Sequence, residues 1–296
     1  MNNNFNTLIS DCIKKWGSED ERTQLFSELL SSWLDNVSVE NRPLFIELLK
    51  KFCYYPHDIT NQLLGTLYQR LLSEKDVSMT NTIYTSIESS TGIVNSSDEY
   101  VIEFKHYNRI SKYLFFDNIR KISEDQWEDI HNIVFIDDCS GSGDTFYKYL
   151  QRNKQLFVNK QVYLIAVHIM EDAYNKIKGL EIESNLKIKI LYGVIQKKAF
   201  AESLAELSCA EAERIYFNES KKNGIPLNHI LGYENSESLM AFYNNTPNNT
   251  LGFFWYDNDN HKSIFPRLDD VKPPWYMKNK KKERNAQNYN NKIRSK

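Results

Sequence analysis

Two adjacent acids followed by small residues are the part of this chain best suited to chemistry. Residues 133–136 read Ile-Val-Phe-Ile, Asp137 and Asp138 follow, and the next residues are Cys-Ser-Gly-Ser-Gly-Asp-Thr. A short apolar run of this kind is typical of a buried strand, and Thr145 is expected to open a helix. Because ligands of open α/β sheets bind at the carboxyl ends of strands, the acids and the loop are predicted to face a ligand.

The small residues of this segment predict a phosphate-binding loop. Gly141 and Gly143 allow a sharp turn, so that successive backbone N–H groups can point at one anion. Hydroxyl groups supply further donors, and the N-terminal end of the expected helix adds partial positive charge. The residues that we expect to bind the phosphate are Ser140, Gly141, Ser142, Gly143, Asp144 and Thr145.

Asp137 and Asp138 require a different role, since two carboxylates would repel a phosphate placed beside them. Carboxylates accept hydrogen bonds from hydroxyl groups and bind divalent cations, often through water. We therefore expect Asp137 and Asp138 to act as the catalytic residues by holding the hydroxyls of a ribose. A phosphate loop next to diol acceptors describes a site for ribose 5-phosphate.

Other phosphate motifs fit the segment less well. A Walker A loop needs a lysine before its Ser or Thr, and residues 137–145 contain none. A dinucleotide-binding fingerprint needs a third Gly or Ala where Phe146 stands. The simplest alternative is a Ser/Gly turn with a helix-capping Asp after a core strand. The complete order of strand, two acids, small loop, Thr and helix favours the ligand site over that turn.

The elements around this loop predict an α/β fold with a parallel sheet. Apolar residues recur at helical spacing over residues 4–75, which indicates about four helices, one of them beginning near residue 42. Farther along, strand-like runs alternate with helical ones, as in a doubly wound sheet. The expected strands are 82–90, 100–104, 132–138, 162–169, 186–194, 237–243 and 251–256, and the expected helices are 106–121, 171–178 and 199–222.

These patterns divide the chain into three predicted parts. Residues 1–80 form a helical N-terminal region, residues 81–270 form the α/β domain, and residues 271–296 form a basic tail that we expect to be mobile. The stretch 278–296 holds eight Lys or Arg and one Glu, which leaves 29 basic residues (37 less 8) and 38 acidic residues (39 less 1) in the rest of the chain. An acidic body with a basic tail is compatible with electrostatic contact to nucleic acid.

Composition limits the class of protein. An apolar fraction of 41% and an aromatic fraction of 13% over 296 residues are typical of a globular protein. The four cysteines are scattered and form neither a Cys-x-x-Cys pair nor a zinc-ligand spacing, which favours a reducing compartment. We find no signal peptide and no apolar run of membrane-spanning length, so the expected location is the cytoplasm, without a membrane partner.

The loop resembles the phosphoribosyl-pyrophosphate loop of type I phosphoribosyltransferases, in which an apolar strand, two acids and a short loop ending Gly-x-Thr follow one another. The variant Asp-Asp-x-x-Gly-Ser-Gly-x-Thr is similar to the PRTase-CE branch of bacterial conflict systems. Residues 231–237 (Leu-Gly-Tyr-Glu-Asn-Ser-Glu), residues 245–251 (Asn-Thr-Pro-Asn-Asn-Thr-Leu) and Trp255 resemble further signatures of that branch. The resemblance spans most of residues 20–268.

The resemblance implies a phosphoribosyltransferase-like fold that binds phosphoribosyl pyrophosphate or a nucleotide, with Mg²⁺ on the pyrophosphate. It also implies a role as effector or accessory subunit of an antiphage system such as a retron, with a reverse transcriptase and its nucleic acid, or another defence protein, as partner. The chain departs from the family in three places. Purine-salvage members carry a base-assisting acid where Gly141 stands and often a basic residue at Asp144, and the best pyrophosphate loop here, 89–92, lacks Lys and Arg.

Two further groups of residues have both a functional and an ordinary interpretation. A basic cluster after residue 104 either contacts pyrophosphate or forms the solvated side of a helix, and a polar cluster near residue 248 either contacts a ligand or simply forms a turn. These residues are Lys105, His106 and Arg109, and Asn245, Asn248, Asn249 and Thr250. Three functions stay open: a phosphoribosyl transferase or nucleotide hydrolase, a nucleotide sensor or structural subunit without catalysis, and a nucleic-acid-bound effector.

Overall fold

The structure is a computed structural model that describes residues 2–88 and 95–267. Two predicted features, the pyrophosphate loop at 89–92 and the tail at 271–296, lie outside these ranges. The helices are α1 (Asn2–Trp16), α2 (Glu21–Asp35), α3 (Arg42–Lys51), α4 (His57–Leu72), α5 (Ser96–Tyr107), α6 (Glu124–Asp129), α7 (Asp144–Arg152), α8 (Glu171–Ser184), α9 (Cys209–Lys222) and α10 (Leu227–Ile230). The strands are β1 (Cys53–Tyr55), β2 (Thr82–Thr85), β3 (Phe115–Phe116), β4 (Asn132–Ser140), β5 (Gln161–Met170), β6 (Lys187–Gln196) and β7 (Met240–Phe242).

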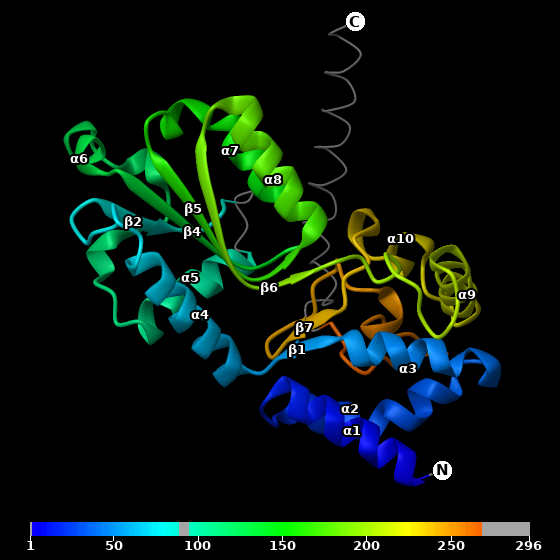
Figure 1. The fold of residues 1–296 in the computed structure, drawn as a ribbon. Coiled ribbons are helices and arrows are strands. Elements are labelled where there is room, and N and C mark those ends of the chain that lie inside the picture. The colour runs from blue at the N-terminus through cyan, green and yellow to red at the C-terminus, as the bar shows by residue number, and fades with distance from the viewer. Residues whose placement is uncertain (1, 89–94, 268–296) are drawn as a thin grey trace, which may run out of the picture. The chain divides into compact units, whose positions relative to one another are not determined.

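The main sheet confirms the predicted α/β class. Within the described residues it has five parallel strands in the order β3-β2-β4-β5-β6, with α4 and α5 on one face and α7 and α8 on the other (Figure 1). Alternate residues of β4 serve the two faces, since Ile133 and Phe135 belong to the core with α7 and α8, and Val134 and Ile136 to the core with α4 and α5. A strand covered on both faces reads as a continuous apolar run, which is how residues 133–136 read. None of the helices in the described ranges has the length and apolar character needed to cross a bilayer.

The strand order places a topological switch point between β2 and β4. From β2 the chain moves to β3 on one side, and β4, β5 and β6 then follow on the other side. Strand β2 ends with Thr85 opposite Phe135, so Asp137 and the residues after it extend past the end of β2. Ligands of open α/β sheets bind in the crevice at such a switch point, and the acid pair lies at its rim.

The N-terminal helices do not form a core of their own. Trp33 of α2 packs against Phe253, and Phe52 after α3 stacks on Phe254 and Phe265 with ring centroids 4.8 Å apart. Strand β1, which follows α3, pairs in parallel with β7 of the C-terminal part. Residues of the predicted helical region and of the predicted α/β domain therefore share one hydrophobic core.

A buried polar contact joins the small β1–β7 sheet to the main sheet. The hydroxyl of Tyr55 in β1 lies 2.8 Å from Nδ1 of His168 in β5, and both side chains are almost wholly buried. Burial lowers the pKa of His168 to about 3, so its ring is neutral at physiological pH. A neutral ring costs less to bury than a charged one, and its Nε2 is buried without a hydrogen-bond partner among the described residues, so this histidine fits a packing role better than an acid–base role.

Two predicted strands are wrong. Residues 100–104 lie in α5, because Tyr100 and Phe104 are four residues apart and bury the same face of a helix. Residues 251–256 contain a 3-10 turn at Gly252–Phe254, and a Cβ at Gly252 would lie 2.5 Å from the carbonyl oxygen of His229. That close backbone approach leaves no room for an extended strand of ordinary residues.

Two predicted helices are wrong in extent. The segment 106–121 contains two 3-10 turns and the short strand β3, because α5 ends at Tyr107 and Arg109 adopts a left-handed backbone conformation. The segment 199–222 becomes helical only at Cys209, the start of α9. Of the predicted strand 237–243, only Met240–Phe242 pairs as β7, and strand β1 was not predicted at all.

We expect the buried Arg22 to stabilise the contact between α2 and the segment after β7. Its guanidinium donates to the carbonyls of Phe242 and Pro266 and to the hydroxyl of Thr246 at 2.7–2.8 Å, and burial lowers its pKa. Arg22→Met would leave buried acceptors without a donor and should lower the free energy of unfolding by about 3 kcal/mol. Chemical denaturation measures this difference.

The matched control is Arg42→Met. Arg42 pairs with Asp35 at 2.9 Å on the surface, and the loss of an exposed ion pair costs about 1 kcal/mol or less. Equal losses for both variants would contradict the anchoring role of Arg22.

Candidate functional site

The predicted order of strand, acids, loop and helix is present. Strand β4 carries Asp137 and Asp138 near its carboxyl end and continues to Ser140, two residues farther than expected. Helix α7 then begins at Asp144, with Gly143 as its N-cap residue, so Thr145 is the second helical residue and not the first. The loop between strand and helix is therefore shorter than predicted, and it brings the acid pair close to the helix N-terminus.

Asp138 is held by the N-terminus of α5. The hydroxyl of Ser96 donates to Oδ1 of Asp138 at 2.9 Å, and the hydroxyl of Ser97 donates to the carbonyl of Ile136. The carboxylate of Asp98 accepts from the hydroxyl of Ser86, the residue after β2. The start of α5 thus connects the ends of β2 and β4 at the switch point.

Ser96, Ser97 and Asp98 of α5 were not among the predicted site residues. Because residues 100–104 were predicted to form a strand, a helix that begins at Ser96 was not expected. The signal was present as Asn95 followed three residues later by Asp98, the spacing of a capping box. In the structure, the backbone N–H of Asn95 donates to Asp98 at 3.0 Å, as that spacing predicts.

Asp137 lies against its neighbour in a protein-lined setting. It keeps some exposed surface, and its Oδ1 accepts from the backbone N–H of Asp138 at 3.1 Å. Burial, and then the negative charge of Asp138, raise the pKa of Asp137 well above its ordinary value. Ionising both acids costs free energy, because two negative charges so close together repel each other, unless hydroxyl donors or a cation bind to them.

The start of α7 has donors that the helix does not use. Its N-cap, Gly143, has no side chain to accept from the first turn, and within residues 2–88 and 95–267 Ser142 Oγ accepts only from the N–H of Asp144, at 3.3 Å. The next N–H groups of a helix have no carbonyl partner within it. Ser142 is partly exposed and Thr145 is exposed, while Ser140 is buried in the strand. Ser142 and Thr145 are therefore better placed to meet a ligand than Ser140.

Gly143 has a second reason to be glycine. We expected it to keep the backbone open for a phosphate, and its φ of +75° is indeed in the left-handed region. A Cβ at this position would also lie 3.1 Å from Cα of Ala173 in α8. The close packing of α8 on the loop therefore restricts this position even when no ligand is considered.

Asp144 does not leave an uncompensated negative charge in the loop. Its carboxylate, with only 11% of the side chain exposed, forms ion pairs with Lys148 one turn along α7 and with Lys176 of α8. The two ammonium groups outnumber the carboxylate, so this cluster carries a net positive charge beside the helix N-terminus. The i,i+4 spacing of Lys148 was visible in the sequence, whereas Lys176 is brought there only by the packing of α8.

Asn249 fills the space above Gly141. A Cβ built on Gly141 would lie 2.2 Å from Cγ and Nδ2 of Asn249. The amide of Asn249, from a turn more than a hundred residues downstream, thus occupies the position of a side chain at Gly141. Type I purine-salvage enzymes, by the resemblance noted above, carry an acid at Gly141, and here an amide stands in that space.

The other residues of the two uncertain clusters differ in position. Lys105 follows Ser96 by nine residues of α5, so it lies about 13 Å farther along the helix axis. The structure therefore carries Lys105, His106 and Arg109 away from the acid pair. Asn248 is exposed, and the hydroxyl of Thr250 donates to the carbonyl of Met240. Asn249, by contrast, has its side-chain amide at the Cβ position of Gly141 in the loop.

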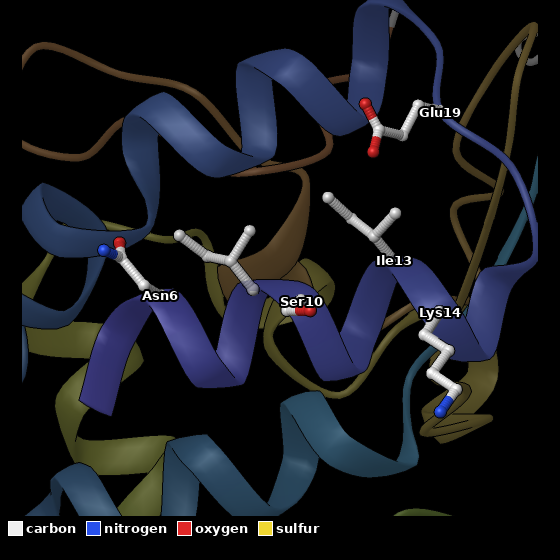
Figure 2. A pocket seen from close by; sticks show the side chains of 6 residues that line it. Asn6, Ser10, Ile13, Lys14 and Glu19 are labelled. Carbon is white, nitrogen blue, oxygen red and sulfur yellow. The ribbon is translucent and has the colours of Figure 1, made fainter. Parts of the chain in front are cut away.

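A separate surface pocket of about 490 Å³ lies along α1 (Figure 2). Figure 2 shows the side chain of Ile13 directed toward Glu19, while Lys14 points away from it. The lining residues are Asn6, Ile9, Ser10, Ile13, Lys14 and Glu19. None of the predicted site residues lies there, and its two charged lining residues, Lys14 and Glu19, are not directed toward each other.

We expect a double-mutant cycle to reveal the contact between Gly141 and Asn249. Gly141→Ala should lower the free energy of unfolding by about 1–3 kcal/mol, because the new methyl group overlaps the Asn249 amide. In the background of Asn249→Ala the same substitution should cost about 1 kcal/mol less, since the overlap is gone. Denaturant unfolding of the four proteins gives the coupling energy.

Gly179→Ala is the control for this cycle, because a Cβ at Gly179 of α8 meets no atom within 4 Å. It should leave stability unchanged or raise it by about 0.5–1 kcal/mol. Additive effects of Gly141→Ala and Asn249→Ala would show that the two residues are not in contact.

Comparison with known proteins supports the resemblance seen in the sequence. The PRTase-CE family model matches residues 30–267, well over half of the chain, and this match includes the acid pair, the loop and Asn249. It begins after the residues that line the α1 pocket. Neither the curated proteins nor the solved structures yielded a match. The chain belongs to the PRTase-CE family, whose members are phosphoribosyltransferase-like.

Proposed function

We propose that residues 137–145 bind the ribose 5-phosphate portion of phosphoribosyl pyrophosphate or of a nucleotide. One observation carries the proposal: at the switch point, an acid pair near the carboxyl end of β4 is followed by a helix N-terminus that lacks a side-chain cap. Hydroxyl acceptors and anion donors are thus adjacent, in the order that a ribose 5-phosphate requires.

In this proposal the acid pair and the start of α7 have separate tasks. Asp137 and Asp138 accept hydrogen bonds from the ribose 2′ and 3′ hydroxyls, and Ser96 keeps Asp138 in place. The N–H groups at the start of α7, with Ser142 and Thr145, donate to the 5′-phosphate. The positive field of the lysine pair at Asp144 favours the phosphate dianion.

For a transfer reaction, the bond between C1′ and the pyrophosphate oxygen breaks while a nucleophile forms a new bond to C1′. The nucleophile in this transfer is a base nitrogen, which gives up its proton as the new bond forms. In a nucleotide-degrading enzyme the nucleophile is water, the bond that breaks is the glycosidic bond between C1′ and the base, and the base leaves with a proton that the water gives up. The protein mainly aligns the reactants and stabilises developing charge. Mg²⁺, when bound to the pyrophosphate, would neutralise part of the leaving-group charge.

The described residues contain no group of three or more His, Cys, Asp or Glu able to hold a metal ion by themselves. The residues present fit Mg²⁺ only in the manner common for this ion, with one or two carboxylates and the substrate phosphates as ligands. Asp137 and Asp138 are the carboxylates in question.

A second candidate function is nucleotide binding without catalysis. The amide of Asn249 stands at Gly141, where an acid would assist a departing or attacking base, and an amide does not act as a general acid or base near neutral pH. This observation favours a sensor or a structural subunit of a defence complex. A retron-type setting, with a reverse transcriptase and its nucleic acid or another defence protein as partner, stays a prediction.

We expect the protein to bind ribose 5-phosphate, and titration calorimetry of the full chain is the direct test. Phosphoribosyl pyrophosphate is then added with and without Mg²⁺, and pyrophosphate release is followed with candidate bases and with water alone. Ribose 5-phosphate binding with pyrophosphate release supports the transferase, and binding without release supports the sensor. No binding of either sugar phosphate would refute the proposed function.

We expect Asp137→Asn to weaken ribose 5-phosphate binding while stabilising the fold near neutral pH. The pKa of Asp137 is raised in the folded state, so above about pH 4 the unfolded chain gives up this proton first. Stability is therefore lost as pH rises toward the folded-state pKa, and the Asp137→Asn variant, which has no proton to lose there, avoids that loss. Thermal unfolding of both proteins at pH 4 and pH 7.5 should show an advantage for the variant that grows with pH.

Asp117→Asn is the control, because the pKa of Asp117 is shifted in the opposite direction to that of Asp137. A hydrogen bond from Lys121 lowers the pKa of Asp117, so its charged form stabilises the fold and the variant should gain nothing at pH 7.5. A variant at Asp137 that binds ribose 5-phosphate as well as the unaltered protein would show that this acid does not hold the ribose.

A further inference from the structure

The stretch of residues 104–116 is basic, although the chain around it is acidic. It contains no Asp or Glu, whereas the chain before residue 278 has 38 acidic and 29 basic residues. The end of α5 carries this basic stretch away from the acid pair, so the proposed function leaves it without a task. Its basic side chains and its histidine are Lys105, His106, Arg109 and Lys112.

The cations of the basic stretch are not used inside the protein. The side chains of Lys105, Arg109 and Lys112 donate no hydrogen bond and form no ion pair with any residue that the structure describes. They are not needed to close α5 either. The carbonyl of Lys105 accepts from the N–H of Ile110 at 3.1 Å, and that of His106 accepts from the N–H of Arg109 at 3.2 Å. Their positive charge is therefore available to an anion outside the protein.

The acids that flank the basic stretch are directed to other partners. Glu103 accepts from the hydroxyl of Tyr243, and Asp117 pairs with Lys121 at 2.7 Å. The nearest negative charges along the chain thus do not neutralise the basic stretch, which keeps a local positive field on the surface.

Two exposed tyrosines lie among these cations. The side chain of Tyr113 is 79% exposed, and Nζ of Lys112 lies 5.2 Å from the centroid of its ring. Tyr107 is 48% exposed, and its ring packs on the bare backbone of α4, since a Cβ at Gly65 would lie 2.7 Å from Cε1 of Tyr107. Aromatic surface of this kind is available for stacking beside free positive charge.

The sheet holds the basic stretch in place. Phe115 pairs with Tyr84 of β2, and the two rings stack with centroids 5.0 Å apart. The N–H of Leu114 donates to the carbonyl of Ser111, and Ile110 is buried. Because the backbone is already ordered, a ligand would not have to order it on binding.

We propose that the basic stretch is a binding surface for single-stranded nucleic acid. Free cations neutralise phosphates, and exposed rings stack on unpaired bases, which a duplex keeps stacked on one another. An anionic membrane would also attract the cations, but interfacial binding buries a continuous apolar face. The exposed side chains here are cations and hydroxyl-bearing rings. This inference does not rest on the proposed ribose 5-phosphate site.

The test is fluorescence anisotropy of the full chain with labelled deoxythymidine and uridine oligonucleotides of about 12 nucleotides. Tyr113→Ala should weaken binding about tenfold, whereas Tyr113→Phe, which keeps the ring, should stay within about twofold of the unaltered protein. Arg109→Gln should weaken binding and make the slope of log affinity against log salt shallower by about 0.7. Binding of either strand supports the surface, and the tighter one identifies DNA or RNA as the ligand.

The matched control is Arg214→Gln. Arg214 in α9 is exposed and likewise donates no hydrogen bond to a described residue, so its loss should change neither the affinity nor the salt slope. Residues 278–296 are the same in every variant, so their charges contribute equally to each measurement. Thermal unfolding checks that each variant is folded.

Three results would overturn this inference while leaving the proposed function intact. The first is no binding of either strand. The second is an equal loss of affinity for Arg109→Gln and Arg214→Gln, or none for Tyr113→Ala, which would leave only non-specific charge attraction. The third is equally tight binding of a duplex, or binding of phosphatidylserine vesicles that also falls with Tyr113→Ala.

Discussion

The charge of two neighbouring carboxylates at the end of a buried strand is the constraint around which this site is arranged. Asp137 and Asp138 repel each other and lose water on folding, and the raised pKa of Asp137 is the consequence. The fold offsets part of this cost by placing the hydroxyl of Ser96 on Asp138. Within the part of the chain that the structure describes, Ser96 is the one side chain that donates to the pair, so a ligand with hydroxyl donors would supply hydrogen bonds that the acids lack.

The support for this site reaches through the whole described structure. The aromatic core that joins α1–α3 to the residues around Phe253 and Phe265 includes Tyr54 of β1 and Ala241 of β7, so it holds the C-terminal segment against the small β1–β7 sheet. Arg22 fixes that segment at Phe242 and Thr246, only a few residues before Asn249. The N-terminal helices therefore contribute to the site without touching the loop, because they hold the turn that covers Gly141.

Much of the loop could be predicted because its signals are local. The apolar run at 133–136 can only be satisfied by burial on both faces, and glycine is the residue that adopts the backbone of Gly143 most readily. The failures arose where local patterns are ambiguous. The spacing of Tyr100 and Phe104 is compatible with a strand and with a helix. Both side chains pack in one core with residues of α4 and of the main sheet, and this packing favours the helix. Residues 251–256 look extended, yet close backbone contact at Gly252 bends them into a turn.

The sequence by itself determined the strand, the acid pair, the helix start and the family resemblance, since each depends on residues adjacent in the chain. Only the tertiary structure decided what surrounds them. Lys176 reaches Asp144 because α8 packs on α7, and Asn249 reaches Gly141 because β7 pairs with a strand that begins near residue 53. Contacts between residues so far apart in the chain depend on how whole elements pack, and no spacing within a single segment of sequence records that packing.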